Sequence, residues 1–282
     1  MAGASMKDIK LRIKSVESTM QITKAMQLVA TSKLRRAKER MENSKPFTTI
    51  AQEAISAAAA RCDDANIPFV HSRPLKRRCY VVIAGDRGLA GGYNANVFKT
   101  VSAHAEGVDY CVLPLGRKAV ERFHRYGIES LTDDYVRAEG LSVGSCYQLA
   151  HRLIDGYLAE EYDEVWIIYT SFLSMMSQEV QADRLLPVEK PEADPSRPPV
   201  DTIYELEPAE TLERVIPDFI AGRLYSALCD AFVSEVSARR TAMDSATKNA
   251  GEMISDLRLK FNRARQGAIT QEITEIVAGA EQ

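Results

Sequence analysis

Residues 7–45 read KDIKLRIKSVESTMQITKAMQLVATSKLRRAKERMENSK, and this stretch decides the fold class of the 282-residue chain. No glycine or proline occurs between Gly3 and Pro46, and most residues in between are strong helix formers. The stretch therefore predicts one helix of about 60 Å. Its apolar positions recur every three or four residues with shifts in register, through Met26 and Val29 to Met41, which is typical of an irregular coiled coil. Pro46 is expected to kink or restart the helix.

The end of the chain has the same character. Residues 223–250 contain no glycine or proline, and the helical pattern continues past Gly251 and Gly267. Each of the two long helices has an apolar seam that it cannot bury alone. The sequence therefore favours pairing of the two helices within the chain as an antiparallel coiled coil. A parallel homodimer is the alternative.

The middle of the chain alternates short apolar runs with helical patterns. The runs CYVVIA (79–84), YCVLPL (110–115) and VWIIYT (165–170) are each suited to a strand buried on both faces. This alternation predicts a small parallel sheet in a central Rossmann-like α/β domain. The expected fold class is thus α/β, with a long antiparallel coiled coil of the terminal helices and the segments 1–62, 75–206 and 207–282. The remaining expected elements are helices at 95–104, 117–126 and 143–161 and strands at 179–187 and 202–206.

Charge is distributed unevenly along the chain. The 36 Lys and Arg against 39 Asp and Glu give a net charge of -3, which offers no general electrostatic case for binding nucleic acid. Residues 1–45 nevertheless carry 11 basic and 4 acidic side chains. The basic run 33–40 leaves three interpretations open: a solvated helix face, a surface that docks on an acidic protein, and a DNA contact. The absence of a following leucine heptad disfavours the last.

Other classes of protein are disfavoured by simple counts. No window approaches the ~20 apolar residues that span a bilayer, so no direct membrane span is expected. The five cysteines are widely spaced and form no C-x-x-C pair, which predicts free thiols rather than a metal site. The four histidines have no partner at metal-ligand spacing. No catalytic, metal or cofactor-binding residue is therefore expected.

A glycine-rich segment, GDRGLAGG at 85–92, follows a predicted strand and precedes a predicted helix. An α/β protein would bind a phosphate at this place. The spacing fits neither G-x-G-x-x-G nor G-x-x-x-x-G-K-[ST], and Asp86 would repel a phosphate. A tight strand-to-helix turn is the favoured interpretation, and a nucleotide-binding α/β enzyme with helical extensions is the alternative function.

Five segments of the chain carry a family resemblance: IKLRIKSV (9–16), QITKAMQLVATSK (21–33), DRGLAGG (86–92), AMDSATKN (242–249) and NRARQGAITQEITEIV (262–277). In order and over essentially the whole chain, they resemble the gamma subunit of the rotary ATP synthase. The resemblance implies a non-catalytic central rotor stalk that transmits torque to catalytic beta subunits, with ATP made on other chains and no cofactor bound. It implies as partners the alpha and beta subunits of the head, the epsilon subunit and the membrane rotor ring of c subunits, and a peripheral location on the cytoplasmic face of a bacterial inner membrane.

The same resemblance implies roles for individual residues. The alternative at each position is ordinary helix packing or exposure to solvent. Met26, Arg239, Arg265 and Gln266 match positions that contact the catalytic ring. The apolar tip that turns in the bearing corresponds to Ile269, Ile273 and Ile276, and the contact with the rotor ring corresponds to Tyr204, Leu206 and Glu207.

Overall fold

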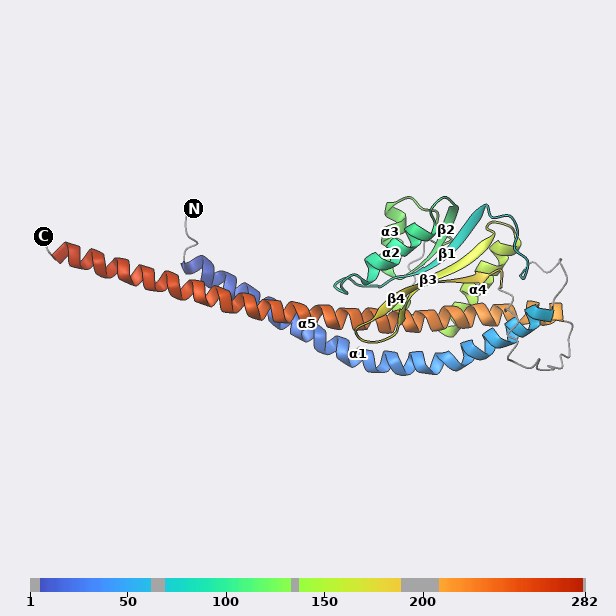
Figure 1. The fold of residues 1–282 in the computed structure, drawn as a ribbon, viewed down its shortest axis with the longest axis horizontal. Coiled ribbons are helices and arrows are strands. Elements are labelled where there is room, and N and C mark those ends of the chain that lie inside the picture. The colour runs from blue at the N-terminus through green and yellow to red at the C-terminus, as the bar shows by residue number, and fades with distance from the viewer. Residues whose placement is uncertain (1–5, 62–68, 133–136, 189–207, 281–282) are drawn as a thin grey trace. The chain divides into compact units, whose positions relative to one another are not determined.

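A computed structural model describes residues 6–61, 69–132, 137–188 and 208–280 of the chain (Figure 1). The chain divides into two compact units, Met1–Ser32 with Arg239–Gln282, and Lys33–Ala238. We call them the helix-pair unit and the sheet unit. Two long helices contribute to both: α1 spans Met6–Arg61, with 56 residues, and α5 spans Pro208–Ala280, with 73 residues.

Both long helices contain a proline. α1 runs through Pro46 as one helix and does not restart there. α5 begins at Pro208 and runs through Pro217, so it includes residues that precede the run 223–250 without glycine or proline. A proline inside a helix removes one backbone hydrogen bond, and tertiary packing on both sides of it can offset that loss. Around Pro217 this packing consists of the completely buried side chains of Leu212, Ile216, Ile220 and Leu224.

In the helix-pair unit, α1 and α5 run antiparallel within one chain. Thr23 Oγ1 lies 2.8 Å from Thr247 Oγ1, and Gln27 Nε2 donates to Asp244 Oδ1 at 2.9 Å. Position numbers thus fall along α5 as they rise along α1, as an antiparallel pair requires. The pairing within the chain is confirmed and replaces the parallel homodimer. The buried side chains of this unit are Ile9, Thr23, Ala30, Met243, Ala250, Ile254 and Leu257.

The sheet unit contains a four-stranded sheet in the order β2-β1-β3-β4. β1 pairs in parallel with both β2 and β3, whereas β3 and β4 are antiparallel. The parallel arrangement expected of the strands at 79–84, 110–115 and 165–170 is thus confirmed, whereas the sequence pattern did not indicate a direction for the strand at 179–187. The last strand differs because only residues 173–177 connect β3 to β4, too few for the crossover that a parallel pair needs. The strands are β1 Arg77–Ile83, β2 Asp109–Leu115, β3 Glu164–Phe172 and β4 Gln178–Leu186.

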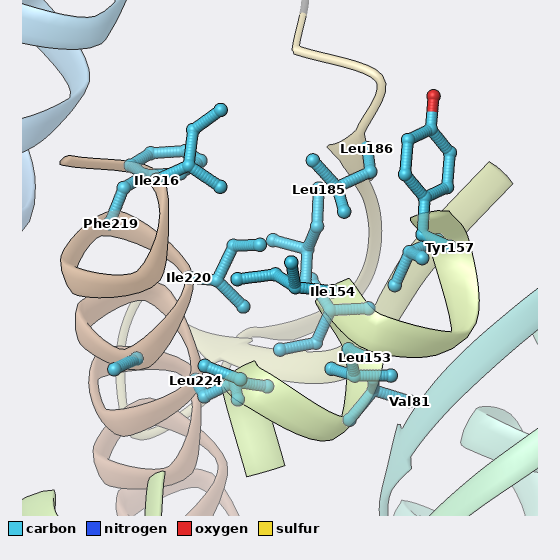
Figure 2. Close-up of a cluster of buried hydrophobic side chains, with 14 of the residues drawn as sticks. Val81, Leu153, Ile154, Tyr157, Leu185, Leu186, Ile216, Phe219, Ile220 and Leu224 are labelled. Atoms are coloured by element: carbon cyan, nitrogen blue, oxygen red, sulfur yellow. The ribbon is translucent and has the colours of Figure 1, made fainter. Parts of the chain in front are cut away.

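The helices of the sheet unit cover both faces of the sheet, so each buried strand alternates its side chains between two cores. Tyr80 and Val82 of β1 belong to the core under α2 and α3, whereas Val81 belongs to the larger core with α4 and α5. Figure 2 shows Val81, Leu153 of α4 and Leu224 of α5 in that larger core. The remaining helices are α2 Tyr93–His104, α3 Arg117–Arg125, the 3₁₀ turn η1 Ala138–Gly140 and α4 Val143–Leu158.

The expected strands at 79–84, 110–115, 165–170 and 179–187 are thus confirmed, with bounds shifted by a few residues. The expected strand at 202–206 lies outside the described residues.

Cysteines that are far apart in the sequence meet in the sheet unit. Cys79 and Cys111 are register partners on β1 and β2, and both are buried. Burial raises the pKa of the Cys79 thiol well above its ordinary value. Burial, together with the nearby Cys229, raises the pKa of the Cys146 thiol to about 12. The wide spacing in the sequence concealed both of these neighbourhoods.

Candidate functional site

The glycine-rich segment after β1 forms a turn whose polar groups serve the chain's own backbone. The carboxylate of Asp86 accepts hydrogen bonds from the backbone N–H groups of Arg117 at 3.2 Å, Ala138 at 3.4 Å and Glu139 at 3.3 Å. Helix N-termini attract anions, and at the start of α3 this carboxylate is already the anion. The side chain of Asn94 accepts from the N–H of Gly85 at 2.9 Å. These contacts support the interpretation of the segment as a structural turn.

α5 occupies the region beyond the carboxyl ends of the strands, where open α/β sheets usually bind ligands. Tyr93 Oη donates to the backbone carbonyl of Ala231 at 3.2 Å. At the end of β3, Ser171 Oγ and the N–H of Phe172 each donate to the carboxylate of Asp230 at 3.3 Å. Burial raises the pKa of this carboxyl group above its ordinary value.

The fit between α5 and the turn is also close at Gly85. A Cβ atom at Gly85 would lie 2.8 Å from the carboxyl carbon of Glu235, a buried residue of α5. The arrangement of α5 over the strand ends therefore gives no support to the nucleotide-binding alternative. The sequence analysis did not predict that α5 covers the strand ends, because the local pattern of α5 does not indicate that its polar side chains face a sheet.

The helix-pair unit contains the residues that the family resemblance implies for contact with a catalytic ring. Met26 is half-buried and lies on α1 between Thr23 and Gln27, two of the residues that bond to α5. Arg239 is half-buried, whereas Arg265 and Gln266 are exposed. The structure thus does not gather these four residues into one cluster, and they are distributed along the unit.

The C-terminal part of α5 extends past the N-terminal end of α1 (Figure 1). The last buried residue of α5 is Leu257, and residues 269–277 are all exposed. Three of the exposed side chains are the isoleucines expected at the tip, Ile269 at 47%, Ile273 at 56% and Ile276 at 71% exposure. Contiguous exposed apolar surface is typical of sites of protein contact.

α1 adds exposed apolar side chains that sequence reasoning missed. Val29 was expected in the seam of the helix pair, but it is exposed and Ala30 is buried in its place. Successive positions of a helix point about 100° apart, so with Ala30 in the seam the side chain of Val29 faces outward. The large exposed apolar side chains of α1 in this unit are Met6, Leu11, Ile22, Leu28 and Val29.

Positive charge accompanies these apolar side chains. Residues 6–32 and 239–280 carry 12 Lys and Arg against 7 Asp and Glu. A long surface that is both apolar and basic is suited to contact with acidic protein partners.

Three of the expected positions, Tyr204, Leu206 and Glu207, lie outside the described residues. Among the residues that are described, no group of three or more His, Cys, Asp or Glu side chains could hold a metal ion. None of the described helices is long and apolar enough to cross a membrane.

Comparison with known proteins gives consistent matches along the chain. A family model described as ATP synthase matches residues 5–282. The ATP synthase gamma chain of Ruminococcus albus is 45% identical over 278 residues, which cover 97% of this chain and 96% of that one. The ATP synthase gamma chain of Desulforamulus reducens is 41% identical over 279 residues, or 98% of both chains.

Solved structures share the fold at lower identity. A rotor chain of the Euglena gracilis mitochondrial ATP synthase has a TM-score of 0.67 at 15% identity, over 94% of this chain and 98% of that one. A chain in the central stalk and c-ring structure of the Tetrahymena thermophila mitochondrial ATP synthase has a TM-score of 0.60 at 24% identity, over 80% of this chain and 99% of that one.

Proposed function

Because this chain belongs to the family of ATP synthase gamma chains, we propose that it is the central stalk of a rotary ATP synthase. In this role it carries torque between an ion-driven rotor ring in the membrane and catalytic subunits that make ATP. The observation that carries the proposal is the 45% identity to a gamma chain over 97% of the sequence. The chain itself is non-catalytic, and its partners are the alpha and beta subunits of the head, the epsilon subunit and the c ring.

The antiparallel helix pair supports this role physically. A stalk must transmit torque without unwinding, and two helices bonded to each other resist twisting better than one. The pair is held by apolar packing and by side-chain bonds such as Gln27 to Asp244 and Arg258 to Glu17, both at 2.9 Å. The exposed apolar and basic surface of this unit is then the part that meets the head.

Within this function we assign the individual residues as follows. Met26, Arg239, Arg265 and Gln266 contact the catalytic ring, since the helix-pair unit presents them along its length. The exposed isoleucines at 269, 273 and 276 form the tip that turns in an apolar bearing. Tyr204, Leu206 and Glu207 contact the rotor ring.

The proposed functional segments are 1–62 and 207–282 for the stalk helices and 75–206 for the α/β domain at the foot. The proposed location is peripheral, on the cytoplasmic face of a bacterial inner membrane.

A rotation assay tests the proposal directly. The complex is assembled from this chain with the alpha and beta subunits of the same organism, and a bead is attached through Met176→Cys in a Cys62→Ser background. Met176 suits the attachment because it is 90% exposed at the β3–β4 turn. We expect the bead to rotate in one direction when ATP is supplied and to stop when ATP is removed. ATP hydrolysis by the assembled complex with a stationary bead would overturn the proposed role.

A further inference from the structure

A hollow of about 390 Å³ lies between α1 and α5 in the sheet unit, and the role of a stalk does not account for it. Arg36, Arg40 and Asn43 line it from α1, and Tyr225 lines it from α5. The other lining residues are Glu39 and Ser44.

Arg40 is held in place by neutral groups. Its Nε donates to Tyr225 Oη at 2.9 Å and its Nη2 donates to the carbonyl of Leu141 at 2.9 Å. Its guanidinium carbon lies 5.0 Å from the centre of the Tyr225 ring. These contacts use two of the five N–H groups of the guanidinium. The positive charge is thus oriented, but neither hydrogen-bond acceptor carries a charge that neutralises it.

Arg36 brings a second positive charge to the same hollow. It stands one helical turn before Arg40, so the two side chains share one face of α1 and repel each other. Among the residues that the structure describes, no carboxylate lies within 4.0 Å of a nitrogen of either guanidinium. The carboxylate of Glu39 lines the hollow and leaves an excess of one positive charge there.

From this arrangement we propose that the hollow binds a phosphate-type oxyanion, either inorganic phosphate or the phosphate group of a small phosphorylated molecule. The Cα atoms of Arg36 and Arg40, which carry the two guanidinium groups, lie about 6 Å apart along the helix axis. A tetrahedral anion presents oxygens in several directions and can accept from both groups, with the amide of Asn43 as a further donor. A single planar carboxylate pairs best with one guanidinium. Bound phosphate also removes the repulsion between Arg36 and Arg40.

Equilibrium dialysis of the full chain against labelled inorganic phosphate, in chloride buffer of constant ionic strength, tests the proposal. We expect saturable binding to one site with a dissociation constant of about 1 mM. Arg36→Gln and Arg40→Gln should each weaken binding about tenfold, since each removes a charged hydrogen bond to the anion.

Two further variants separate a built site from general electrostatics. Arg35→Gln removes an equal charge from an exposed position one residue away, which faces another side of α1 and does not line the hollow. It should leave the dissociation constant within a factor of about two. Tyr225→Phe keeps every charge but releases Arg40, and it should weaken binding about threefold. Circular dichroism and the thermal midpoint of each variant show that it is folded.

Two results would overturn the proposal. One is the absence of saturable binding to the folded wild-type chain up to tens of millimolar phosphate. An acidic side chain of a partner protein would then be the better candidate for the group that fills the hollow. The other is an equal loss of binding in Arg35→Gln and Arg36→Gln, which would show only general attraction to positive charge. Either result leaves the rotation assay unaffected.

Discussion

Thr23 Oγ1 and Thr247 Oγ1 lie 2.8 Å apart across the helix pair, although 224 positions separate the two residues in the sequence. Thr23 Oγ1 also lies 3.0 Å from the carbonyl oxygen of Met20, and Thr247 Oγ1 lies 2.8 Å from that of Met243. Since each hydroxyl has one hydrogen, one threonine donates to its own helix while the other donates across the pair. The contact therefore sits inside a seam that is otherwise apolar, and it sets the level at which the two helices meet.

This contact predicts a disulfide within one chain. Thr23→Cys with Thr247→Cys, in a Cys62→Ser background, should form an intrachain bond on mild oxidation, because the two side chains already approach within reach of a disulfide. Non-reducing electrophoresis should show a monomer of altered mobility. Leu28→Cys with Thr247→Cys is the control and should not cross-link, since Leu28 is exposed. A product that contains only disulfide-linked dimers would contradict the antiparallel pairing.

Gly116 is expected to tolerate no side chain. It begins the turn into α3 with a φ of 92°, and a Cβ atom there would lie 2.0 Å from the carbonyl oxygen of Ala84. Gly116→Ala should lower the free energy of unfolding by about 3 kcal/mol or more, through the clash and the strained backbone. Urea unfolding followed by circular dichroism measures this loss.

Gly140→Ala is the matched control, because a Cβ atom at Gly140 meets no atom within 4 Å. It should change the free energy of unfolding by no more than about 0.5 kcal/mol. Equal stability of the two variants would show that the approach of Gly116 to Ala84 is looser than described.

His104 is expected to make stability depend on pH. Its Nδ1 lies 2.8 Å from Tyr80 Oη, and its ring lies 4.4 Å from that of Trp166. Burial, with the nearby positive charge of Arg78, lowers the pKa of His104 below its ordinary value of 6.5, against the opposing effect of Glu164.

The unfolded chain therefore binds a proton at this position more readily than the folded chain does. The stabilisation is present above pH 6.5 and is lost as the pH falls from 6.5 through the folded pKa. Urea unfolding at several pH values should show a decline in this range that His104→Gln makes shallower. His151→Gln, at an exposed position, is the control. A slope that is unchanged in His104→Gln would contradict the prediction.

The buried cysteines should be inert in the folded protein. Burial raises the pKa of Cys146 to about 12, and Cys79, Cys111 and Cys229 are buried as well. Because a reagent in solution cannot reach these enclosed sulfur atoms, a Cys62→Ser chain should give no colour with an aromatic disulfide reagent at neutral pH until urea unfolds it. Met176→Cys in that background should react at once and serves as the positive control. Rapid labelling of the folded Cys62→Ser chain would contradict the burial of these four cysteines.

The isoleucine tip should affect assembly but not folding. Ile273 is 56% exposed in the chain alone, so Ile273→Asp should leave the unfolding midpoint in urea unchanged. Burial of an isoleucine in a bearing contributes about 1.5–3 kcal/mol, so the affinity for an alpha and beta subunit head should fall about tenfold or more. Glu272→Gln, at a neighbouring exposed position, should bind as the wild type does. Unchanged affinity in Ile273→Asp would argue against a role for the tip.

The long helices and the buried strands were predictable from local pattern. Three properties of neighbouring residues predict α1, α5 and the three parallel strands well. They are the absence of glycine and proline between Gly3 and Pro46, the recurrence of apolar residues every three or four positions, and the β-branched runs. The antiparallel sense of β4 was missed, since it depends on how the chain turns after β3.

The candidate site was harder to predict from local sequence pattern. The sequence placed Val29 in the seam, although the structure exposes Val29 and buries Ala30. Both residues fit a drifting apolar pattern, and the choice between them depends on how closely α5 approaches.

By itself, then, the sequence determined where this chain is helical and which runs are buried strands, because helix propensity and hydrophobic period act over a few residues. The family followed from the resemblance of particular segments to known members. Only the tertiary structure decided which face each helix buries. It also decided that α5 closes the strand ends around Asp230 and that Arg36 and Arg40 face a common hollow beside Tyr225. The contact between Phe172 and Asp230 joins residues 58 positions apart, and the contact between Arg40 and Tyr225 joins residues 185 positions apart. Contacts between such distant residues leave no periodic pattern in either of the segments that make them.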